Sequence, residues 1–428
     1  MGYFVIDGLK MPVSGEVVIS GAKNAALPIM AASMLCRSAE LGRCPVLSDT
    51  EAAAKILKTA GFECTRDKSF KIRRISDGKA EIPRELCGAM RSSVLFAAPF
   101  LCRFGYVRMC APGGCRLGAR PIDIHLDILA KTGAEITYDN DSITAKADCL
   151  KGAEIVLPFP SVGATETAIM AGVCADGRTI IKNPAQEPEI HDLCSFLNFA
   201  GADIHCGKEI EINGKNAFLG NAVHTIMPDR IEAGTYLAAA AVTGGELFLK
   251  NAVYEHIRPF ADILTQMGAA VCQTETGMYI DAPERLYNPD FVETAPYPLF
   301  PTDMQPQLTA LAAVKCGDCL IKENIFETRF AHIPQLNKMG ADIEQKSPRE
   351  FLVHGMNRRL ESKTISASDL RCGGGTDTCG TFGQRRGSDT KRRLYSARLR
   401  RYLSKDVAYW CKNAVLHLTR RAFKFYYI

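Results

Sequence analysis

Five similar segments recur along this chain at nearly constant spacing. Each has a leucine, three further residues and a glycine, and the five glycines are separated by 72, 68, 67 and 72 residues. A helix that ends in a left-handed glycine and continues into a short strand produces such a segment. Because chance does not explain five copies, the chain reuses one helix-and-strand unit. The glycines are Gly61, Gly133, Gly201, Gly268 and Gly340.

The composition is that of a large protein of a reducing compartment. A length of 428 residues and a hydrophobic content of 47% allow a large core and predict two domains. No run of about 18 apolar residues is present, so no transmembrane helix is expected. The first ten residues lack the pattern of a secretory signal. Seventeen cysteines without disulfide-like spacing predict a cytoplasmic location.

The positive charge is concentrated in the C-terminal segment. The whole chain has a formal charge of +5, but residues 372–428 contain 13 Lys or Arg and 3 Asp or Glu. The remainder has 39 basic and 44 acidic residues, a balance of −5. A mildly acidic body of this kind gives little support to nucleic-acid binding.

The same segment interrupts the repeat. A sixth glycine is expected near position 410, where Trp410 stands. Tryptophan has the single codon TGG and the codon of Cys411 begins with T, so loss of one base upstream gives GGT, a glycine codon. In that frame residues 372–381 can encode an apolar helix start, and residues 397–401 can encode Arg-Gly-Tyr-Glu-Asp. We infer that the frame slips next to Arg371. The alternative is a genuine basic tail that binds an acidic partner.

A lysine and an asparagine begin a predicted helix after a glycine turn, in Ser20-Gly-Ala-Lys23-Asn24-Ala-Ala-Leu-Pro28. Backbone amides at a helix start attract anions, and Lys23 adds a positive charge. An ordinary surface lysine is the alternative interpretation.

A cysteine lies in a glycine-rich loop flanked by arginines, Ala111-Pro-Gly-Gly-Cys115-Arg-Leu-Gly-Ala-Arg120-Pro-Ile-Asp-Ile-His125. Nearby cations favour the thiolate, which makes Cys115 a candidate acid or nucleophile. Arg120 can form paired hydrogen bonds to a carboxylate or phosphate. A cysteine is more often a small buried hydrophobe, but the neighbouring glycines and arginines argue against burial.

Other polar residues lie near predicted helix starts. Arg91 opens an apolar helix, and residues 161–163 form a small-residue turn that runs into a helix and suits a phosphate. Asp303 lies beside a helix start, where it could act as a cap or as a base. Glu187 and Glu189 offer paired carboxylates, with a solvated turn as the alternative.

Together these segments resemble the enolpyruvyl transferase family, through every repeat up to Arg371. The cysteine loop followed by Arg120-Pro-Ile-Asp-Ile-His is closer to the UDP-N-acetylglucosamine branch than to the shikimate branch, which lacks that loop. The resemblance implies an α/β fold, a two-lobed inside-out barrel of helix-and-sheet units with the helices inside. It places one lobe at 21–227 and the other at 1–20 plus 228–371, with the sixth unit disrupted by the tail 372–428.

The resemblance implies transfer of enolpyruvyl from phosphoenolpyruvate to the 3′-hydroxyl of UDP-N-acetylglucosamine, with release of phosphate. This is the first committed step of peptidoglycan synthesis and the target of fosfomycin. Cys115 is then the proton donor to the methylene carbon, Asp303 the base, and Lys23 a catalytic cation. The implied substrate-binding residues are Lys23, Asn24, Arg91, Arg120, Pro121, Ile122, Asp123, Ile124, Ser161, Val162, Gly163, Asp303, Ile325, Arg329 and Arg371.

The resemblance implies no metal and no organic cofactor, and we expect a cytoplasmic monomer with no nucleic-acid or membrane partner. The family's last unit carries an Arg-Gly-Tyr-Glu turn whose arginine reaches phosphoenolpyruvate, and here Ala397 stands at that place. A second hypothesis is therefore a non-catalytic relative that binds the sugar nucleotide but lacks the last unit. A third, a shikimate-pathway transferase, is disfavoured by Cys115 and its loop.

Overall fold

The computed structural model describes residues 3–6, 12–110, 122–139, 142–358, 360–361, 397–398 and 425–427. These residues divide into two compact units. The first, here called the N-terminal unit, runs from Ser20 to Met227, and the second, the C-terminal unit, combines residues up to Ile19 with those from Pro228 onward. Each unit has its own hydrophobic core. No helix within the described ranges is long and apolar enough to cross a membrane.

One supersecondary unit recurs in both compact units: a helix, a strand, a second helix and a β-hairpin. Its first copy consists of α1 (Lys23–Ala32), β3 (Cys36–Gly42), α2 (Ser48–Thr59), β4 (Phe62–Arg66) and β5 (Phe70–Arg74). In this copy β5 pairs antiparallel with both β3 and β4.

Two further copies complete the N-terminal unit. They are α4 (Ala97–Phe104), β6 (Tyr106–Cys110), α5 (Asp123–Lys131), β7 (Glu135–Asp139) and β8 (Ser142–Lys146), and then α6 (Val162–Cys174), β10 (Asp176–Lys182), α7 (Pro188–Phe199), β11 (Ile204–Cys206) and β12 (Ile210–Lys215). The short elements α3 (Arg84–Ala89) and η2 (Arg91–Phe96) precede α4, and the 3-10 turn η1 (Ser33–Leu35) follows α1.

The C-terminal unit contains two copies. They are α8 (Arg230–Thr243), β14 (Glu246–Lys250), α9 (Tyr254–Met267), β15 (Ala270–Gln273) and β16 (Gly277–Asp281), and then α10 (Gln305–Val314), β18 (Cys316–Lys322), α11 (Ile333–Lys338), β19 (Asp342–Ser347) and β20 (Glu350–Met356). The 3-10 turn η3 (Thr302–Met304) leads into α10.

The five repeat glycines lie where the second helix of each copy ends. Their φ angles are +86° at Gly61, +100° at Gly133, +108° at Gly201, +112° at Gly268 and +90° at Gly340. Side chains disfavour this left-handed conformation, and glycine adopts it readily. The predicted helix, left-handed glycine and short strand are confirmed at all five positions.

Four of the sheets gain a strand that runs parallel to the first strand of the copy. These strands are β13 (Leu219–Thr225), β9 (Glu154–Val156), β2 (Ser14–Val18) and β17 (Phe291–Glu293), beside β3, β10, β14 and β18 respectively. Strand β2 comes from the beginning of the chain, yet its partner β14 lies in the C-terminal unit. This pairing is why residues 12–19 belong to that unit.

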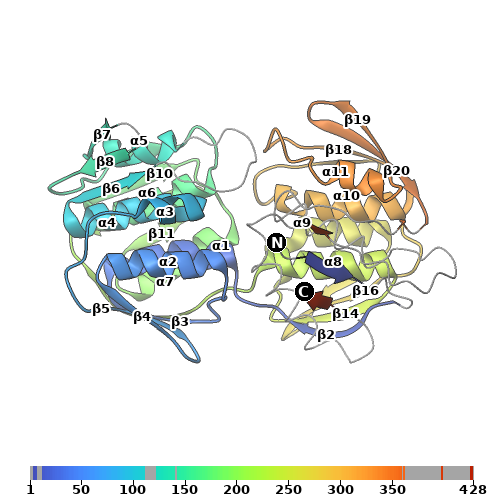
Figure 1. Cartoon of the computed structure of the whole chain (residues 1–428), viewed down its shortest axis with the longest axis horizontal. Helices are drawn as coiled ribbons and strands as arrows, with labels where there is room; N and C mark the ends of the chain where they lie inside the picture. The colour runs from blue at the N-terminus through green and yellow to red at the C-terminus, as the bar shows by residue number, and fades with distance from the viewer. Residues whose placement is uncertain are drawn as a thin grey trace. The chain divides into compact units, whose positions relative to one another are not determined.

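The first helix of a copy lies inside its unit, with sheets toward the outside (Figure 1). All ten residues of α10 are buried, as are eight of the ten residues of α1. A helix that is apolar on all sides must be enclosed by protein. This arrangement of repeated helix-and-sheet units with helices inside is the α/β fold that the family resemblance implied.

The ends of the chain form one further small sheet. Strand β1 (Tyr3–Ile6) pairs antiparallel with β21 (Ala397–Arg398) and with β22 (Phe425–Tyr427). Trp410 and Arg371 lie outside the described residues. The inferred frame slip therefore stays a prediction.

Candidate active site

The candidate residues fall into two groups, one in each compact unit. Lys23, Asn24, Arg91, Ile122, Asp123, Ile124, Ser161, Val162 and Gly163 lie in the N-terminal unit, and Asp303, Ile325 and Arg329 lie in the C-terminal unit. Cys115, Arg120, Pro121 and Arg371 lie outside the described residues. Their roles remain predictions.

Lys23 begins α1, as predicted, and forms an ion pair with α2. Its Nζ lies 2.9 Å from Oδ2 of Asp49, and each of the two side chains is 23% exposed. Lys23 is thus a half-buried, oriented cation rather than an ordinary surface lysine. Asn24 follows it in the first turn of the helix and is also half-buried.

Arg91 begins the 3-10 helix η2, which runs directly into α4. The sequence predicted that Arg91 opens an apolar helix, and η2 is the first part of that helix, with Val94 and Phe96 buried. Partial burial lowers the pKa of Arg91 from its usual value. Its guanidinium nevertheless stays charged at neutral pH, because arginine starts from a pKa far above 7.

Ser161 caps α6, which confirms the predicted turn into a helix. Its Oγ accepts a hydrogen bond from the Ala164 amide at 3.4 Å, and its carbonyl accepts one from the Thr165 hydroxyl at 2.9 Å. Gly163 lies in the first turn, where a Cβ would be 3.1 Å from Cε1 of His125. Val162 and Gly163 are half-buried, so the turn presents small groups and backbone amides.

His125 connects this turn to α5. Its Nδ1 lies 2.7 Å from Oγ1 of Thr167 in α6, and the side chain is buried. Burial, and to a lesser extent Arg91, lowers the pKa of His125 to about 4, so the ring is neutral at pH 7. The contact brings residues 122–124 and 161–163 together. The sequence motif contained His125, but its position there did not single it out as a link between helices.

Three carboxylates cluster between α6 and the start of α7. Glu166 and Glu189 are buried, so the alternative of a solvated turn at Glu187 and Glu189 is wrong. Burial raises the pKa of Glu166 well above its usual value, and the charges of Glu189 and then Glu187 raise it further. Glu166 therefore holds a proton more readily than an ordinary glutamate does.

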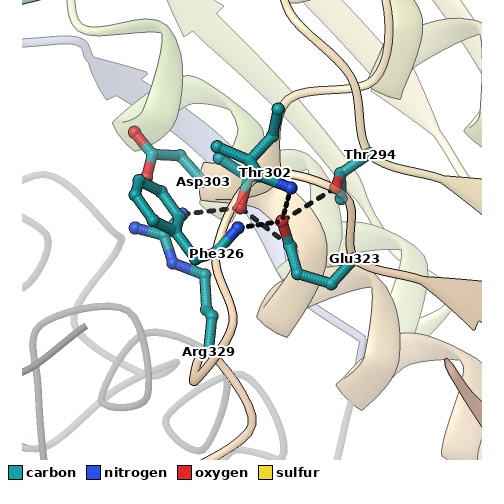
Figure 2. A network of polar contacts seen from close by, with 7 residues as sticks. Thr294, Thr302, Asp303, Glu323, Phe326 and Arg329 are labelled. Atoms are coloured by element: carbon teal, nitrogen blue, oxygen red, sulfur yellow. Dashed lines mark hydrogen bonds and ion pairs between the residues drawn. The ribbon is translucent and has the colours of Figure 1, made fainter. Parts of the chain in front are cut away.

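Asp303 lies in η3 and forms an ion pair with Arg329. Its Oδ1 accepts a hydrogen bond from Arg329 Nη1 at 2.8 Å, and the side chains are 21% and 6% exposed. The guanidinium of Arg329 also stacks on Phe326, 4.4 Å from the ring centroid (Figure 2). The N-cap positions here are Pro301 for η3 and Met304 for α10, so Asp303 occupies neither of them. Of the two interpretations of Asp303, the helix cap is therefore wrong, and a base remains open.

Glu323 was missed by the sequence analysis. It directly follows β18 and is fully buried beside Thr294 and Thr302 (Figure 2). An acidic residue at the end of an apolar strand was the available signal, but a solvated strand end gives the same pattern. The decisive observation is burial, which depends on the tertiary structure.

No group of three His, Cys, Asp or Glu within the described part of the chain could hold a metal ion. The described cysteines, thirteen in number, are free thiols. The chemistry of the described site thus rests on ion pairs, backbone amides and buried carboxylates.

Comparison with known families decides the kind of protein. The family model of EPSP synthase (3-phosphoshikimate 1-carboxyvinyltransferase) matches residues 9–376. The chain belongs to this enzyme family. It is 41% identical over 365 residues to UDP-N-acetylglucosamine 1-carboxyvinyltransferase 1 of Caldanaerobacter subterraneus subsp. tengcongensis, covering 85% of this chain and 87% of that protein.

Solved structures of the family share the fold. The enolpyruvyl transferase NikO from Streptomyces tendae superposes with a TM-score of 0.84 at 21% identity, over 100% of this chain and 98% of that chain. EPSP synthase from Acinetobacter baumannii gives a TM-score of 0.73 at 16% identity, over 100% of both chains. The predicted inside-out α/β barrel of the enolpyruvyl transferases is confirmed.

Proposed function

We propose that this transferase moves the enolpyruvyl group of phosphoenolpyruvate to the 3′-hydroxyl of UDP-N-acetylglucosamine and releases phosphate, the first committed step of peptidoglycan synthesis. The observation that carries the proposal is the 41% identity, over 85% of this chain, to a UDP-N-acetylglucosamine 1-carboxyvinyltransferase. The shikimate reaction of the wider family is less well supported, because the sequence contains the cysteine loop that the shikimate branch lacks.

The N-terminal unit supplies most of the binding groups in this proposal. Residues 122–124 and 161–163 bind the sugar nucleotide, with Asn24 and Arg91. Support comes from the His125–Thr167 contact of 2.7 Å, which joins the two helices that carry these residues. Lys23 holds the phosphate of phosphoenolpyruvate, and its ion pair with Asp49 orients it for that task.

The C-terminal unit supplies the proposed base. Asp303 accepts the proton of the sugar 3′-hydroxyl, and Arg329 stabilises the ionised carboxylate that a base needs. The Asp303–Arg329 distance of 2.8 Å supports this role. Ile325, which is 37% exposed, contacts the sugar nucleotide.

The proposed reaction is an addition followed by an elimination. The sugar oxygen loses its proton to Asp303 and bonds to C2 of phosphoenolpyruvate, while Cys115 donates a proton to the methylene carbon. The tetrahedral adduct then returns a proton from that carbon to the Cys115 thiolate and expels phosphate, which restores the double bond. The phosphate takes up the proton held by Asp303, so both groups return to their starting states. Lys23, Arg120 and Arg371 hold the phosphate and carboxylate, so that charge is stabilised by groups already in place.

The proposal also covers the organisation of the chain. The two lobes are 21–227 and 1–20 with 228–371, and residues 372–428 are a frame-shifted tail that lowers activity. The family match ends at residue 376, close to Arg371, which supports a break there.

We further propose a cytoplasmic monomer without nucleic-acid or membrane partners. Light scattering of the purified chain tests the monomer.

Two measurements test the function. UDP-N-acetylglucosamine is titrated calorimetrically into the full chain, and phosphate release is followed after addition of phosphoenolpyruvate. Binding with release supports the transferase, whereas binding without release supports the non-catalytic relative. Phosphate release with shikimate 3-phosphate, and none with UDP-N-acetylglucosamine, would overturn the proposed substrate.

Fosfomycin tests the assigned thiol separately. It is an epoxide that reacts with a thiolate, so peptide mapping should find the label on Cys115. Labelling confined to other cysteines would remove Cys115 from the mechanism.

A further inference from the structure

Glu323 is a buried carboxylate for which the reaction has no direct use. It follows the last residue of β18, and its exposed fraction is 0%. A carboxylate in such a place is costly unless hydrogen bonds replace its water. The hydrogen-bond donors around the Glu323 carboxylate therefore indicate its role.

Four donors converge on the two oxygens of Glu323. Oε1 accepts from the Thr294 hydroxyl at 2.9 Å and from the backbone amides of Ile325 at 2.8 Å and Phe326 at 3.1 Å. Oε2 accepts from the Thr302 hydroxyl at 2.8 Å. All four groups donate, so the site is complementary to an ionised, acceptor-only carboxylate.

The bond to Thr302 fixes the direction of a chain of hydrogen bonds (Figure 2). Because the Thr302 hydroxyl gives its proton to Glu323, its oxygen is left to accept from Arg329 Nη1 at 2.9 Å. The same Nη1 donates to Oδ1 of Asp303 at 2.8 Å. The orientation of Arg329 against Asp303 thus depends on Glu323 through one hydroxyl.

The two amide contacts act on the neighbouring backbone. They tie the turn at Ile325 and Phe326 to the end of β18, and the Phe326 ring lies against the guanidinium of Arg329. Glu323 therefore restrains Arg329 from two sides, through Thr302 and through the ring. It also fixes the backbone that carries Ile325.

We propose that Glu323 is a positioning residue that holds Asp303, Arg329 and Ile325 in one arrangement for the sugar nucleotide. Its carboxylate touches no reacting atom and acts through Thr302 and the 325–326 backbone. The inference rests on the proposed function, because Asp303 and Ile325 are the groups assigned there to the substrate.

Three variants separate this role from simple stability. Glu323→Gln keeps the size but removes the charge. Its NH2 can only face Thr302, whose hydroxyl must then accept, and its neutral oxygen accepts from the two backbone amides more weakly than a carboxylate does. Thr302→Val removes the link to Arg329 and leaves the amide contacts, and Thr302→Ser restores the hydroxyl. Thr294→Val is the control for affinity, since it removes a hydroxyl from the same carboxylate on a side that does not contact Arg329. It also removes the acceptor of the Asn324 amide, so it is compared by affinity and not by exchange.

Hydrogen exchange of the peptide containing Ile325 and Phe326, and calorimetric affinity for UDP-N-acetylglucosamine, are measured on the full chain. In Glu323→Gln, exchange should become about tenfold faster and affinity about tenfold weaker, because the two amide bonds and the Thr302 bond each lose a charged acceptor. Thr302→Val should weaken affinity several-fold without faster exchange. Thr302→Ser should restore the affinity, and Thr294→Val should cost less than Thr302→Val.

Two results would overturn the positioning role. One is unchanged exchange at residues 325–326 in Glu323→Gln. The other is a loss of affinity in Thr294→Val as large as in Thr302→Val, with no rescue by Thr302→Ser, which would indicate a general loss of packing. Failure of the unaltered chain to bind UDP-N-acetylglucosamine would instead overturn the proposed function, and the exchange measurement would still decide whether Glu323 holds the turn.

Discussion

The starts of α6 and α10 occupy equivalent places in two copies of the same repeat, yet their chemistry differs. Each helix follows a short strand, β9 or β17, which runs parallel to the strand after the helix, β10 or β18. Even a side-chain contact is repeated. The Asn183 amide donates to the Leu157 carbonyl at 3.0 Å, and the Asn324 amide donates to the Thr294 carbonyl at 3.0 Å.

The polar groups at the two helix starts have different charge. At α6 they are neutral: the Ser161 hydroxyl, and Gly163 packed against His125. At α10 they are charged: Asp303 is paired with Arg329. One backbone unit thus carries neutral polar groups in one copy and an ion pair in another, because chemistry depends on the side chains placed on the fold.

The sharpest test of this difference replaces one side chain at the start of α10 and one at the start of α6. Asp303→Asn keeps the shape and removes the proposed base, so kcat should fall by about 10² to 10⁴. Ser161→Ala removes a helix cap, which costs about 1 kcal/mol, and should act mainly on KM. Phosphate release in the frame-restored chain measures both parameters. An equal fall of kcat in both variants would end the distinction.

Restoring the frame after Arg371 should raise both the rate of the reaction and the stability of the protein. The repaired tail would place an arginine at position 397 and a glycine at position 410, and the rate should rise about 100- to 1000-fold, the usual effect of one transition-state donor. Each Leu or Ile that the restored unit buries should add about 1.5–3 kcal/mol as an upper bound. Phosphate release and thermal unfolding of both chains test this. Equal turnover and equal melting would make the basic tail a genuine element.

Both regions contain a buried neutral histidine, and acid should therefore destabilise both. Burial lowers the pKa of His125 to about 4, and burial together with Arg329 lowers that of His332 to about 3. Unfolded histidine titrates near 6.5, so the unfolded state binds protons first. The contribution of each neutral histidine to the free energy of unfolding is fully present above pH 6.5 and is lost as the pH falls toward the folded-state pKa. For His125 this loss amounts to about 3 kcal/mol.

Chemical unfolding between pH 7 and pH 4 measures this loss. His125→Gln cannot take up the proton, so its free energy of unfolding should decline less steeply over that range. His205→Gln is the control, since the His205 side chain is 72% exposed. The same slope in all three proteins would contradict the assignment to His125.

The smallest effect is expected from Gly163→Val, which adds a side chain at the start of α6. A Cβ at Gly163 would lie 3.1 Å from the His125 ring, whereas one at Gly88, also in a helix, would have nothing within 4 Å. Overpacking of this kind costs about 1–3 kcal/mol. Gly163→Val should therefore melt lower and bind UDP-N-acetylglucosamine more weakly, while Gly88→Val should do neither. Equal melting temperatures would show that the turn tolerates a side chain.

The sequence predicted what is decided over short stretches of chain. The five glycines marked helix ends because a left-handed φ is a property of single residues. The helix starts at Lys23 and after Ser161 could also be predicted, because a helix start depends on a few neighbouring residues. The inside placement of the first helices came from family resemblance rather than from any local pattern.

The tertiary structure alone decided which polar groups meet. Lys23 and Asp49 are 26 residues apart, His125 and Thr167 are 42 apart, and Thr302 and Glu323 are 21 apart. Nothing near either member of such a pair in the sequence specifies its partner or its burial. The cost of removing a charge from water depends on the whole surrounding shell of donors and acceptors. For that reason the sequence left the role of Asp303 open, and only the structure showed that it lies past the N-cap Pro301 and pairs with Arg329.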